Sequence, residues 1–370
     1  MSEPLSQPFE PSPAPSTSPA PVTWADAARE AAFNAWLSSI AAEHELLPAT
    51  LRIASADASF RRYLRIDTAG GSSRIIMDAP PSHEDCRPFV KIDRLMADAG
   101  LNVPSVFAWE EAQGFMLLGD LGDRTMIEEV ATSETPATQA LYMRAVDALV
   151  AWQLASRPDV LPPYDRALLA RELALFPDWY LERHRGVKVE GAMRETLEKT
   201  FELIIERNLA SPNVYVHRDF MPRNLMVPRE AHESRLGVLD FQDAVYGPVT
   251  YDIASLMRDA FLTWDEEFVL DITVRYWQKA QKAGLPVNPD FGEFYRGVEW
   301  MGLQRHLKVA GIFARLTLRD GKPKYLADTP RFIGYIRATA SRYRELTPLV
   351  RLIDQVEGTQ AAAAYSFGRL

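Results

Sequence analysis

A run of eight residues near the middle of the chain carries five polar side chains and is enclosed by short apolar stretches. The run covers residues 217–224 and reads His-Arg-Asp-Phe-Met-Pro-Arg-Asn. The apolar stretches, which are bounded by turn residues, predict short strands over 214–217, 225–227 and 236–239. The last two strands form a hairpin, and this hairpin brings Asp240 back beside Asn224. We therefore expect several polar side chains to gather at one end of one β-element.

Three of these side chains have the chemistry that phosphoryl transfer needs. That reaction needs a group that positions and deprotonates the attacking hydroxyl, and oxygen ligands that hold Mg²⁺ on the nucleotide phosphates. Asp219, at the mouth of the loop, is the candidate base. Asn224 and Asp240 offer an amide oxygen and a carboxylate, which suit a hard cation. The alternative is that Asp219 is only a capping or turn carboxylate.

Two further residues are expected to support the loop. His217 is interpreted as a residue that shapes the loop through hydrogen bonds, not as one that transfers protons. Asp252 stands at the start of a predicted helix, where an N-cap is the simplest role. We expect its carboxylate to hold the catalytic loop in place.

The pattern of apolar residues predicts an α+β protein with two lobes. Alternating stretches over 62–66 and 74–77 predict strands in a β-rich N-lobe over residues 23–118. A hinge is expected over 119–123. Helical spacing dominates afterwards and predicts the C-lobe, residues 124–348. The ends, 1–22 and 349–370, are expected to be tails, the first because it is rich in Pro and Ser.

Composition excludes several classes of protein. The net charge is −9 and the pI about 5.3, the opposite of a typical nucleic-acid binder, so no nucleic-acid partner is expected. Cys86 is the only cysteine, which rules out an internal disulfide and a cysteine zinc site. No 18 consecutive residues are apolar and no secretory signal is visible, so we expect a cytoplasmic protein without a membrane partner.

The run 217–224 with Asp240 resembles the aminoglycoside phosphotransferase and choline kinase group, relatives of the protein kinases. The likeness extends over about residues 50–320. It implies a bilobal protein-kinase-like fold that uses ATP and Mg²⁺. It also implies that Asp219 is the catalytic base and that Asn224 and Asp240 are the Mg²⁺ ligands. The backbone from Leu118 to Asp120 would meet the adenine.

The chain departs from the protein-kinase pattern at the phosphates. The first turn, 55–60, contains no glycine, and the strand over 74–78 has no lysine, its place being taken by Met77 or Asp78. Since a phosphate needs a cation, one of four arginines is expected to replace the lysine, namely Arg61, Arg62, Arg65 or Arg74. The alternative is that these arginines face solvent. The residues predicted to bind the nucleotide are Ser59, Phe60, Arg61, Arg62, Leu118 and Asp120.

Two segments resemble a bacterial subgroup of this family. They are 59–63 with 77–81, and 300–308. The resemblance implies an ATP-dependent kinase of the C1 (anomeric) hydroxyl of N-acetylmuramate and N-acetylglucosamine, acting in cell-wall recycling. Its amino-sugar product would pass to a sugar-1-phosphate nucleotidyltransferase.

A predicted helix over 299–316 offers candidates for the acceptor site. Arg305 and Lys308 lie on a different side from its apolar stripe, and a basic face fits the lactyl carboxylate of N-acetylmuramate. The substrate-binding candidates are Arg223, Arg305, His306 and Lys308. A simpler interpretation is a solvated basic face. Two other functions also stay open: a kinase of another small hydroxyl acceptor, such as an aminoglycoside or choline, and a nucleotide-binding pseudokinase.

Overall fold

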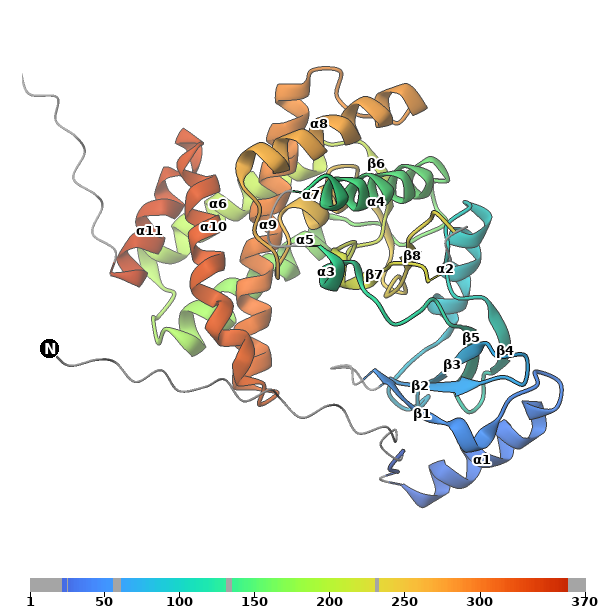
Figure 1. The fold of residues 1–370 in the computed structure, drawn as a ribbon. Helices are drawn as coiled ribbons and strands as arrows, with labels where there is room; N and C mark the ends of the chain where they lie inside the picture. Colours follow the sequence, from blue (N-terminus) through green and yellow to red (C-terminus); the bar gives the residue numbers. More distant parts are fainter. Residues whose placement is uncertain (1–21, 25, 56–60, 131–134, 230–232, 359–370) are drawn as a thin grey trace, which may run out of the picture. The chain divides into compact units, whose positions relative to one another are not determined.

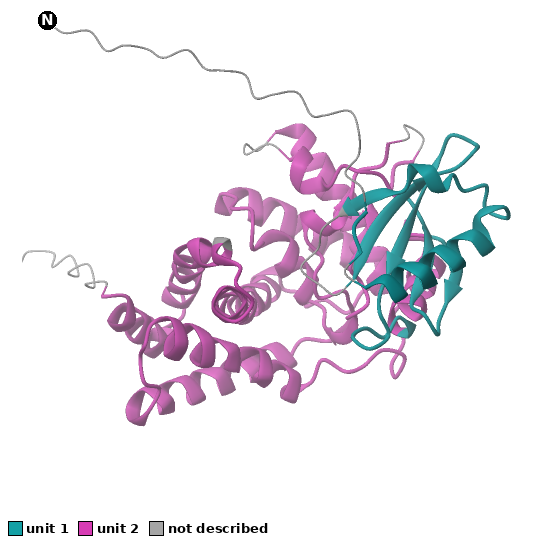
Figure 2. Cartoon of the chain, turned by 90° about the horizontal axis from the view of Figure 1, so that it is seen from below, with its two compact units in different colours: residues 1–87, 105–120 teal, residues 88–104, 121–370 magenta. Residues whose placement is uncertain are grey.

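The computed structural model describes residues 22–24, 26–55, 61–130, 135–229 and 233–358. The chain divides into two compact units, residues 1–87 with 105–120 and residues 88–104 with 121–370 (Figure 2). Strands dominate the first unit and helices the second. This distribution is the α+β organisation that the sequence predicted.

The first unit is an antiparallel sheet with a helix against one face (Figure 1). The strand order is β1-β2-β3-β5-β4. The strands are β1 (Arg52–Ser55), β2 (Arg62–Asp67), β3 (Ser73–Asp78), β4 (Val106–Glu110) and β5 (Phe115–Gly119). Helix α1 (Ala27–Ala41) begins at Asp26, whose side chain accepts a hydrogen bond from the backbone of Ala28.

Alternation along the strands assigns each side chain of this sheet to one of two faces. Helix α1 contributes a cluster of buried apolar residues, Phe33, Trp36 and Leu37. They pack with Leu64, Ile66, Ile76, Phe115 and Leu117 of the sheet. Because successive side chains point to opposite faces, Arg62, Arg74 and Asp78 lie on the face that α1 covers. Tyr63, Arg65 and Met77 lie on the other face.

The second unit is built mainly from helices and two small sheets. The α-helices are α2 (Arg87–Asp98), α3 (Met126–Glu129), α4 (Pro136–Leu154), α5 (Arg166–Leu175), α6 (Gly191–Leu209), α7 (Tyr251–Met257), α8 (Glu266–Ala283), α9 (Phe291–Leu318), α10 (Thr329–Ser341) and α11 (Thr347–Glu357). Strand β6 (Asn213–Val216) pairs with β9 (Val245–Pro248), and β7 (Leu225–Met226) pairs with β8 (Gly237–Val238). No helix within the described ranges is both long and apolar enough to cross a membrane.

Helix α9 lies at the centre of this unit, in contact with α5, α6, α7 and α10. Its burial therefore extends over most of its circumference, and it includes charged as well as apolar side chains. Gly311 allows one of the closest approaches, because a Cβ atom there would lie 2.3 Å from the backbone oxygen of Leu175. At Leu175 the α-helical geometry gives way to a π-helix, Phe176–His184, which contains Pro177. A proline has no N–H to donate inside a helix, which accounts for the change of helical geometry at this point.

Two boundaries differ from the sequence prediction. Helix α2 was assigned to the N-lobe but groups with the second unit, where Phe89 packs on Phe241 with ring centroids 4.8 Å apart. The C-terminal tail predicted over 349–370 begins with an ordered helix, α11. Its residues Leu349, Leu352 and Ile353 are buried, and this helical spacing is the signal that the prediction overlooked. The tail predicted over 1–22 lies, except for residue 22, outside the described residues.

Candidate active site

The β7–β8 hairpin brings the polar residues together as its sequence indicated. Leu225 pairs with Val238, and the next backbone bond runs from Leu239 N to Asn224 O at 3.0 Å. Asp240 therefore leaves the hairpin beside Asn224, whose Nδ2 lies 3.3 Å from Asp240 Oδ2. The same amide nitrogen donates a 2.9 Å hydrogen bond to the backbone oxygen of Asp219. One amide thus connects the candidate base to the candidate metal ligand.

Asp252 holds the start of the candidate catalytic loop, which is the run over residues 217–224. Its two carboxylate oxygens accept hydrogen bonds from the backbone N–H groups of His217, at 2.7 Å, and Arg218, at 3.0 Å. Burial raises the pKa of Asp252 to about 7, although these two N–H groups favour the charged form. Asp252 is the second residue of α7 and is buried, so the first turn of this helix positions the carboxylate against the loop.

His217 is also a structural residue in this geometry. Its Nε2 atom lies 3.0 Å from the backbone oxygen of Leu239, while its Nδ1 atom faces the backbone N–H of Asp219 at 3.3 Å. Burial lowers the pKa of His217 to about 4, so the imidazole is neutral at pH 7. A neutral ring with both nitrogens directed at backbone groups connects the loop to the end of β8.

Two residues of the site have left-handed backbones. Arg218, immediately before Asp219, has φ of +77°, and Asp240 has φ of +64°. This conformation is uncommon outside glycine and costs about 1–3 kcal/mol, so surrounding contacts must hold it. Arg218 lies directly before the candidate base Asp219, and Asp240 is itself a candidate metal ligand. The backbone conformation at Arg218 and Asp240 therefore sets the orientation of the carboxylates of Asp219 and Asp240.

Asn224 and Asp240 fit a magnesium ion. The amide nitrogen of Asn224 makes both of its hydrogen bonds to oxygens, which turns the amide oxygen into the atom available to a hard cation. Asp240 is exposed and also accepts a 2.8 Å hydrogen bond from Gln242 Nε2. Mg²⁺ is usually bound by only one or two protein groups together with substrate phosphates. An amide oxygen and a carboxylate match that requirement.

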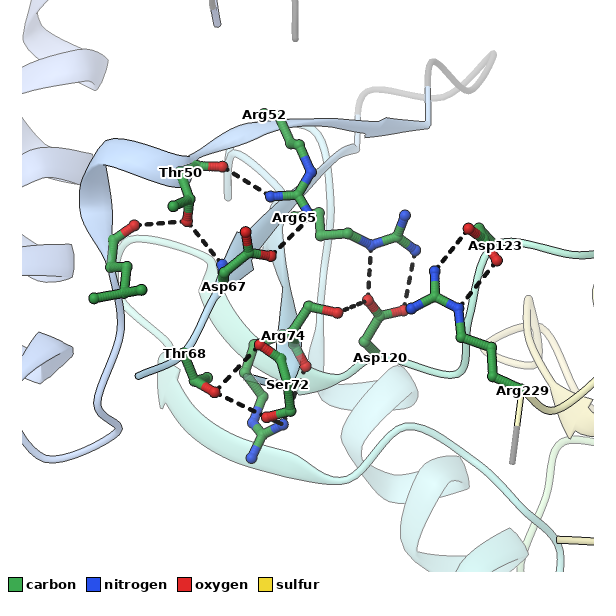
Figure 3. Close-up of polar contacts among 12 residues, drawn as sticks. Thr50, Arg52, Arg65, Asp67, Thr68, Ser72, Arg74, Asp120, Asp123 and Arg229 are labelled. Atoms are coloured by element: carbon green, nitrogen blue, oxygen red, sulfur yellow. Dashed lines mark hydrogen bonds and ion pairs between the residues drawn. The ribbon is translucent and has the colours of Figure 1, made fainter. Parts of the chain in front are cut away.

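The residues predicted to meet the nucleotide are in different environments. Ser59 and Phe60 lie outside the described residues. Leu118 is buried in β5, and the carboxylate of Asp120 binds Arg65 through two hydrogen bonds of 2.7 and 3.0 Å (Figure 3). Ser73 donates a third hydrogen bond to Asp120, at 2.5 Å.

Arg61 and Arg62, though adjacent, are paired on different carboxylates. Arg62 binds Asp78 together with Arg29 of α1, on the face of the sheet that α1 covers. Arg61 binds Glu84 through Nε at 3.2 Å and Nη2 at 2.9 Å. Burial on its own lowers the pKa of Arg61, but Tyr63 and Glu84 outweigh it and the pKa is raised. Since Tyr63 belongs to the face opposite α1, the guanidinium of Arg61 lies near that face.

The interpretation of 299–316 as a solvated basic face is wrong. Arg305, His306 and Lys308 are buried at 4, 2 and 8% exposure, because α9 is covered on most sides. Arg305 Nη1 donates to the backbone oxygen of Arg218 at 2.7 Å, and Lys308 Nζ donates to Glu172 at 2.9 Å. His306 Nε2 lies 3.2 Å from the backbone oxygen of Arg258.

These contacts give three of the four substrate-binding candidates partners inside the protein. Arg223 differs from the other three because its side chain is exposed, and its guanidinium lies 4.8 Å from the ring centre of Phe261. Arg223 is therefore the candidate that the described structure leaves accessible to an acceptor.

Sequence reasoning missed Glu172 and Tyr164, which lie behind the catalytic loop. Glu172 is on α5, three residues after the buried Leu169 and directly before the buried Leu173. A carboxylate within such an apolar stripe is a signal that could have been noticed, since a buried charge requires partners. Those partners, Arg218, Lys308 and Tyr164, are distant from Glu172 in the sequence or lie in a loop, so only the fold reveals them.

Comparison with known proteins identifies close relatives over nearly the whole chain. Residues 50–286 match the family described as "Phosphotransferase enzyme family". The chain is 46% identical over 333 residues to an N-acetylmuramate/N-acetylglucosamine kinase of Neisseria meningitidis, covering 90% of this chain and 97% of that protein. It is 47% identical over 344 residues to the protein of the same name from Pseudomonas aeruginosa, covering 91 and 99%.

A solved structure confirms the type of fold. The structure of aminoglycoside 2'-phosphotransferase-IIIa in complex with GDP superposes with a TM-score of 0.58 and 12% identity. The match covers 85% of this chain and 99% of that one. The predicted α+β kinase-like fold, with a β-rich and a helical lobe, is therefore correct.

Proposed function

Because the chain belongs to the phosphotransferase enzyme family, we propose that it is an ATP-dependent kinase of amino sugars. In this proposal it phosphorylates the anomeric hydroxyl of N-acetylmuramate, N-acetylglucosamine or both. The observation that supports the substrate class most is the identity of 46 to 47% with two kinases named for these sugars. The grouping of Asp219, Asn224 and Asp240 supports the chemistry.

Each group of the site has one task in the proposed reaction. The sugar hydroxyl at C1 attacks the γ-phosphorus of ATP, its proton passes to Asp219, and the bond from phosphorus to the leaving oxygen of ADP breaks. Asn224 and Asp240 would hold Mg²⁺, which neutralises charge on the phosphates when it is bound. The left-handed backbone of Arg218 and the amide of Asn224 fix the direction from which Asp219 approaches the hydroxyl.

Arg61 is the arginine best placed to replace the absent strand lysine. Arg62 and Arg74 lie on the face that α1 covers, where Arg62 is bound by Asp78 and Arg74 lies over the ring of Phe107. Arg65 lies on the opposite face, where its Nε and Nη2 atoms are both bound by Asp120, which also accepts a hydrogen bond from Ser73. The Nε and Nη2 atoms of Arg61 are also bound, both by Oε2 of Glu84, but Arg61 directly follows the predicted turn over 55–60, which stands where protein kinases cover the phosphates. We assign the phosphate cation to Arg61 on this basis.

Arg223 is the proposed contact for the acceptor. It is exposed, lies one residue before the metal ligand Asn224, and has the rigid planar fork that suits a carboxylate. N-acetylmuramate carries a lactyl carboxylate and N-acetylglucosamine does not. A contact from Arg223 to this group would therefore favour the first sugar over the second.

The proposed product places the enzyme in a reaction sequence. A sugar 1-phosphate is the form that a nucleotidyltransferase converts to a nucleotide sugar, and a bacterium that recovers cell-wall sugars needs this step. We propose that such an enzyme consumes the product.

The deciding experiment measures the formation of ADP and the loss of the reducing end of the sugar. The protein is incubated with Mg-ATP and N-acetylmuramate, N-acetylglucosamine, kanamycin or choline, and ADP is followed. Phosphorylation at C1 removes the reducing end of the sugar, so the reducing-sugar signal should fall in equal amount to the ADP formed. ADP without loss of reducing ends would overturn the C1 assignment. Turnover only with kanamycin or choline would favour the alternative acceptors, and nucleotide binding without any turnover would favour a pseudokinase.

A further inference from the structure

Glu172 is a buried carboxylate that binds three side chains at once. Its Oε1 atom accepts hydrogen bonds from Arg218 Nη2 at 2.7 Å and Lys308 Nζ at 2.9 Å. Its Oε2 atom accepts one from the hydroxyl of Tyr164. The side chains of Glu172 and Lys308 are 6 and 11% exposed, and that of Arg218 is 19% exposed. The cluster lies inside the second unit, behind the catalytic loop.

Stability alone does not explain such a cluster. Burying charges removes their hydration, and a buried ion pair is often no more stabilising than apolar residues of the same volume. Burial on its own raises the pKa of Glu172, but Lys308 and Arg218 outweigh this effect and lower the pKa to about 2. Glu172 is therefore charged at every physiological pH, and its two cations compensate it. The question is what this arrangement holds in place.

The cluster holds the residue directly before Asp219. Arg218 is in the left-handed region, and its backbone N–H, its carbonyl and its Nη2 atom are each bound within the second unit, while its Nε atom has no hydrogen-bond partner among the described residues. Its backbone N–H binds Asp252 at 3.0 Å, its carbonyl accepts from Arg305 Nη1 at 2.7 Å, and its guanidinium binds Glu172. Because the conformation is costly for an arginine, release of one of these contacts would let the backbone relax. Asp219 would turn with it.

We propose that Glu172, Lys308 and Arg218 form a clasp that holds the backbone at Arg218 and thereby aims Asp219 at the acceptor. They are positioning residues, since none of them touches a substrate in this role. The inference rests on the proposed function in one respect, that Asp219 is the base. In this proposal Lys308 and Arg305, which were first considered as sugar contacts, instead support the loop. A displacement of a base by about 1 Å can cost 10²-fold in rate.

The same unit contains a matched control. Glu299 on α9 has a side chain that is also 6% exposed and is also bound by two arginines and a tyrosine, namely Arg258, Arg342 and Tyr343. It does not contact the catalytic loop in the described structure. Glu172→Gln and Glu299→Gln therefore remove the same charge from equivalent surroundings, and only the first change affects the clasp.

The test compares these two variants in the full chain. Thermal unfolding, nucleotide affinity, kcat and KM for both substrates are measured for each. We expect a similar loss of thermal stability in both variants. Glu172→Gln should lower kcat by roughly 10- to 100-fold with KM for ATP within about twofold of the wild type. Glu299→Gln should keep kcat within about threefold. Equal kcat values in the two variants would overturn the proposal.

Hydrogen exchange separates this proposal from the choice of substrate. In Glu172→Gln, backbone amides of the peptide over 217–224 should exchange faster than in Glu299→Gln, whether or not any sugar is turned over. If the wild type has no sugar-dependent activity, the proposed function fails while this measurement still decides the clasp. Unchanged exchange over 217–224 in Glu172→Gln would contradict the clasp even in an active sugar kinase.

Discussion

The amide nitrogen of Asn224 donates a 2.9 Å hydrogen bond to the backbone oxygen of Asp219. The same nitrogen lies 3.3 Å from Oδ2 of Asp240. The position of the proposed base and that of the proposed metal ligands are therefore not independent, because one side chain connects them. Asn224 uses its nitrogen for these two contacts, so its oxygen is the atom that the proposal gives to the cation. An aspartate could not make the same contacts, because it has no N–H to donate.

This relationship permits a clean test of the base. The bond from Asn224 reaches the backbone of Asp219, so Asp219→Asn should keep the loop intact and remove only the proton acceptor. We expect kcat to fall by roughly 10²- to 10⁴-fold, while nucleotide affinity stays unchanged. Steady-state ADP release and calorimetric nucleotide binding measure the two quantities. A variant with near-normal kcat would remove Asp219 from that role.

The proposed contact of Arg61 with the phosphates leads to a second prediction. Arg61→Ala should raise KM for ATP by roughly 10- to 100-fold, because a hydrogen bond to a charged phosphate contributes about 1.5–3 kcal/mol. Arg74→Ala is the matched control, since Arg74 lies on the covered face with its guanidinium 4.5 Å from the ring centre of Phe107. Its KM should stay within about twofold. If both variants change KM equally, Arg61 is not the phosphate cation.

Much of this site was readable from the sequence because its geometry is local. Asp240 lies only sixteen positions after Asn224, and turn residues separate the two strands of the hairpin that brings them together. The sheet of the first unit was likewise predictable from alternating residues in β2 and β3. The pairing of β6 with β9 was not, because these strands are separated by the whole hairpin and both are short.

The sequence could not predict which side chains are buried by packing between segments that are distant in the chain. Arg305 and Lys308 were predicted to lie on a basic face, either at the acceptor site or in solvent, because helical spacing describes one helix and not the neighbours that surround it. Contacts with α5 and α7 cover that face of α9. The partners of Glu172 depend on the same packing, for Lys308 is 136 positions away.

A buried acid on α2 makes stability depend on pH. Asp93 is 5% exposed, and its Oδ1 atom has no hydrogen-bond partner among the described residues. Burial raises its pKa to about 7, only partly opposed by Arg94. The folded state therefore binds the proton more tightly than the unfolded state, so this group stabilises the fold below about pH 4 and loses that contribution as the pH rises to 7.

Asp93→Asn removes the titration while keeping the volume of the side chain. We expect the variant to be more stable than the wild type by roughly 1–3 kcal/mol at pH 8, with the difference shrinking towards pH 4. Urea unfolding across this pH range measures it. Asp98→Asn, an exposed change on the same helix, should show no such trend. A difference for Asp93→Asn that does not vary with pH would show that the acid is not buried in its charged form.

The crossing of α9 with the end of α5 leads to the last prediction. At Gly311 a Cβ atom would lie 2.3 Å from the backbone oxygen and 2.4 Å from the carbonyl carbon of Leu175, distances that the backbone must move apart to relieve. Gly311→Ala should therefore destabilise the protein by about 1–3 kcal/mol, as overpacking does. Gly334, inside α10, has no atom within 4 Å of such a Cβ. Gly334→Ala should instead stabilise by about 0.5–1 kcal/mol, because alanine is the better helix former. Thermal unfolding of both variants measures whether each change raises or lowers stability. A stabilising Gly311→Ala would mean that α9 and α5 do not approach each other this closely.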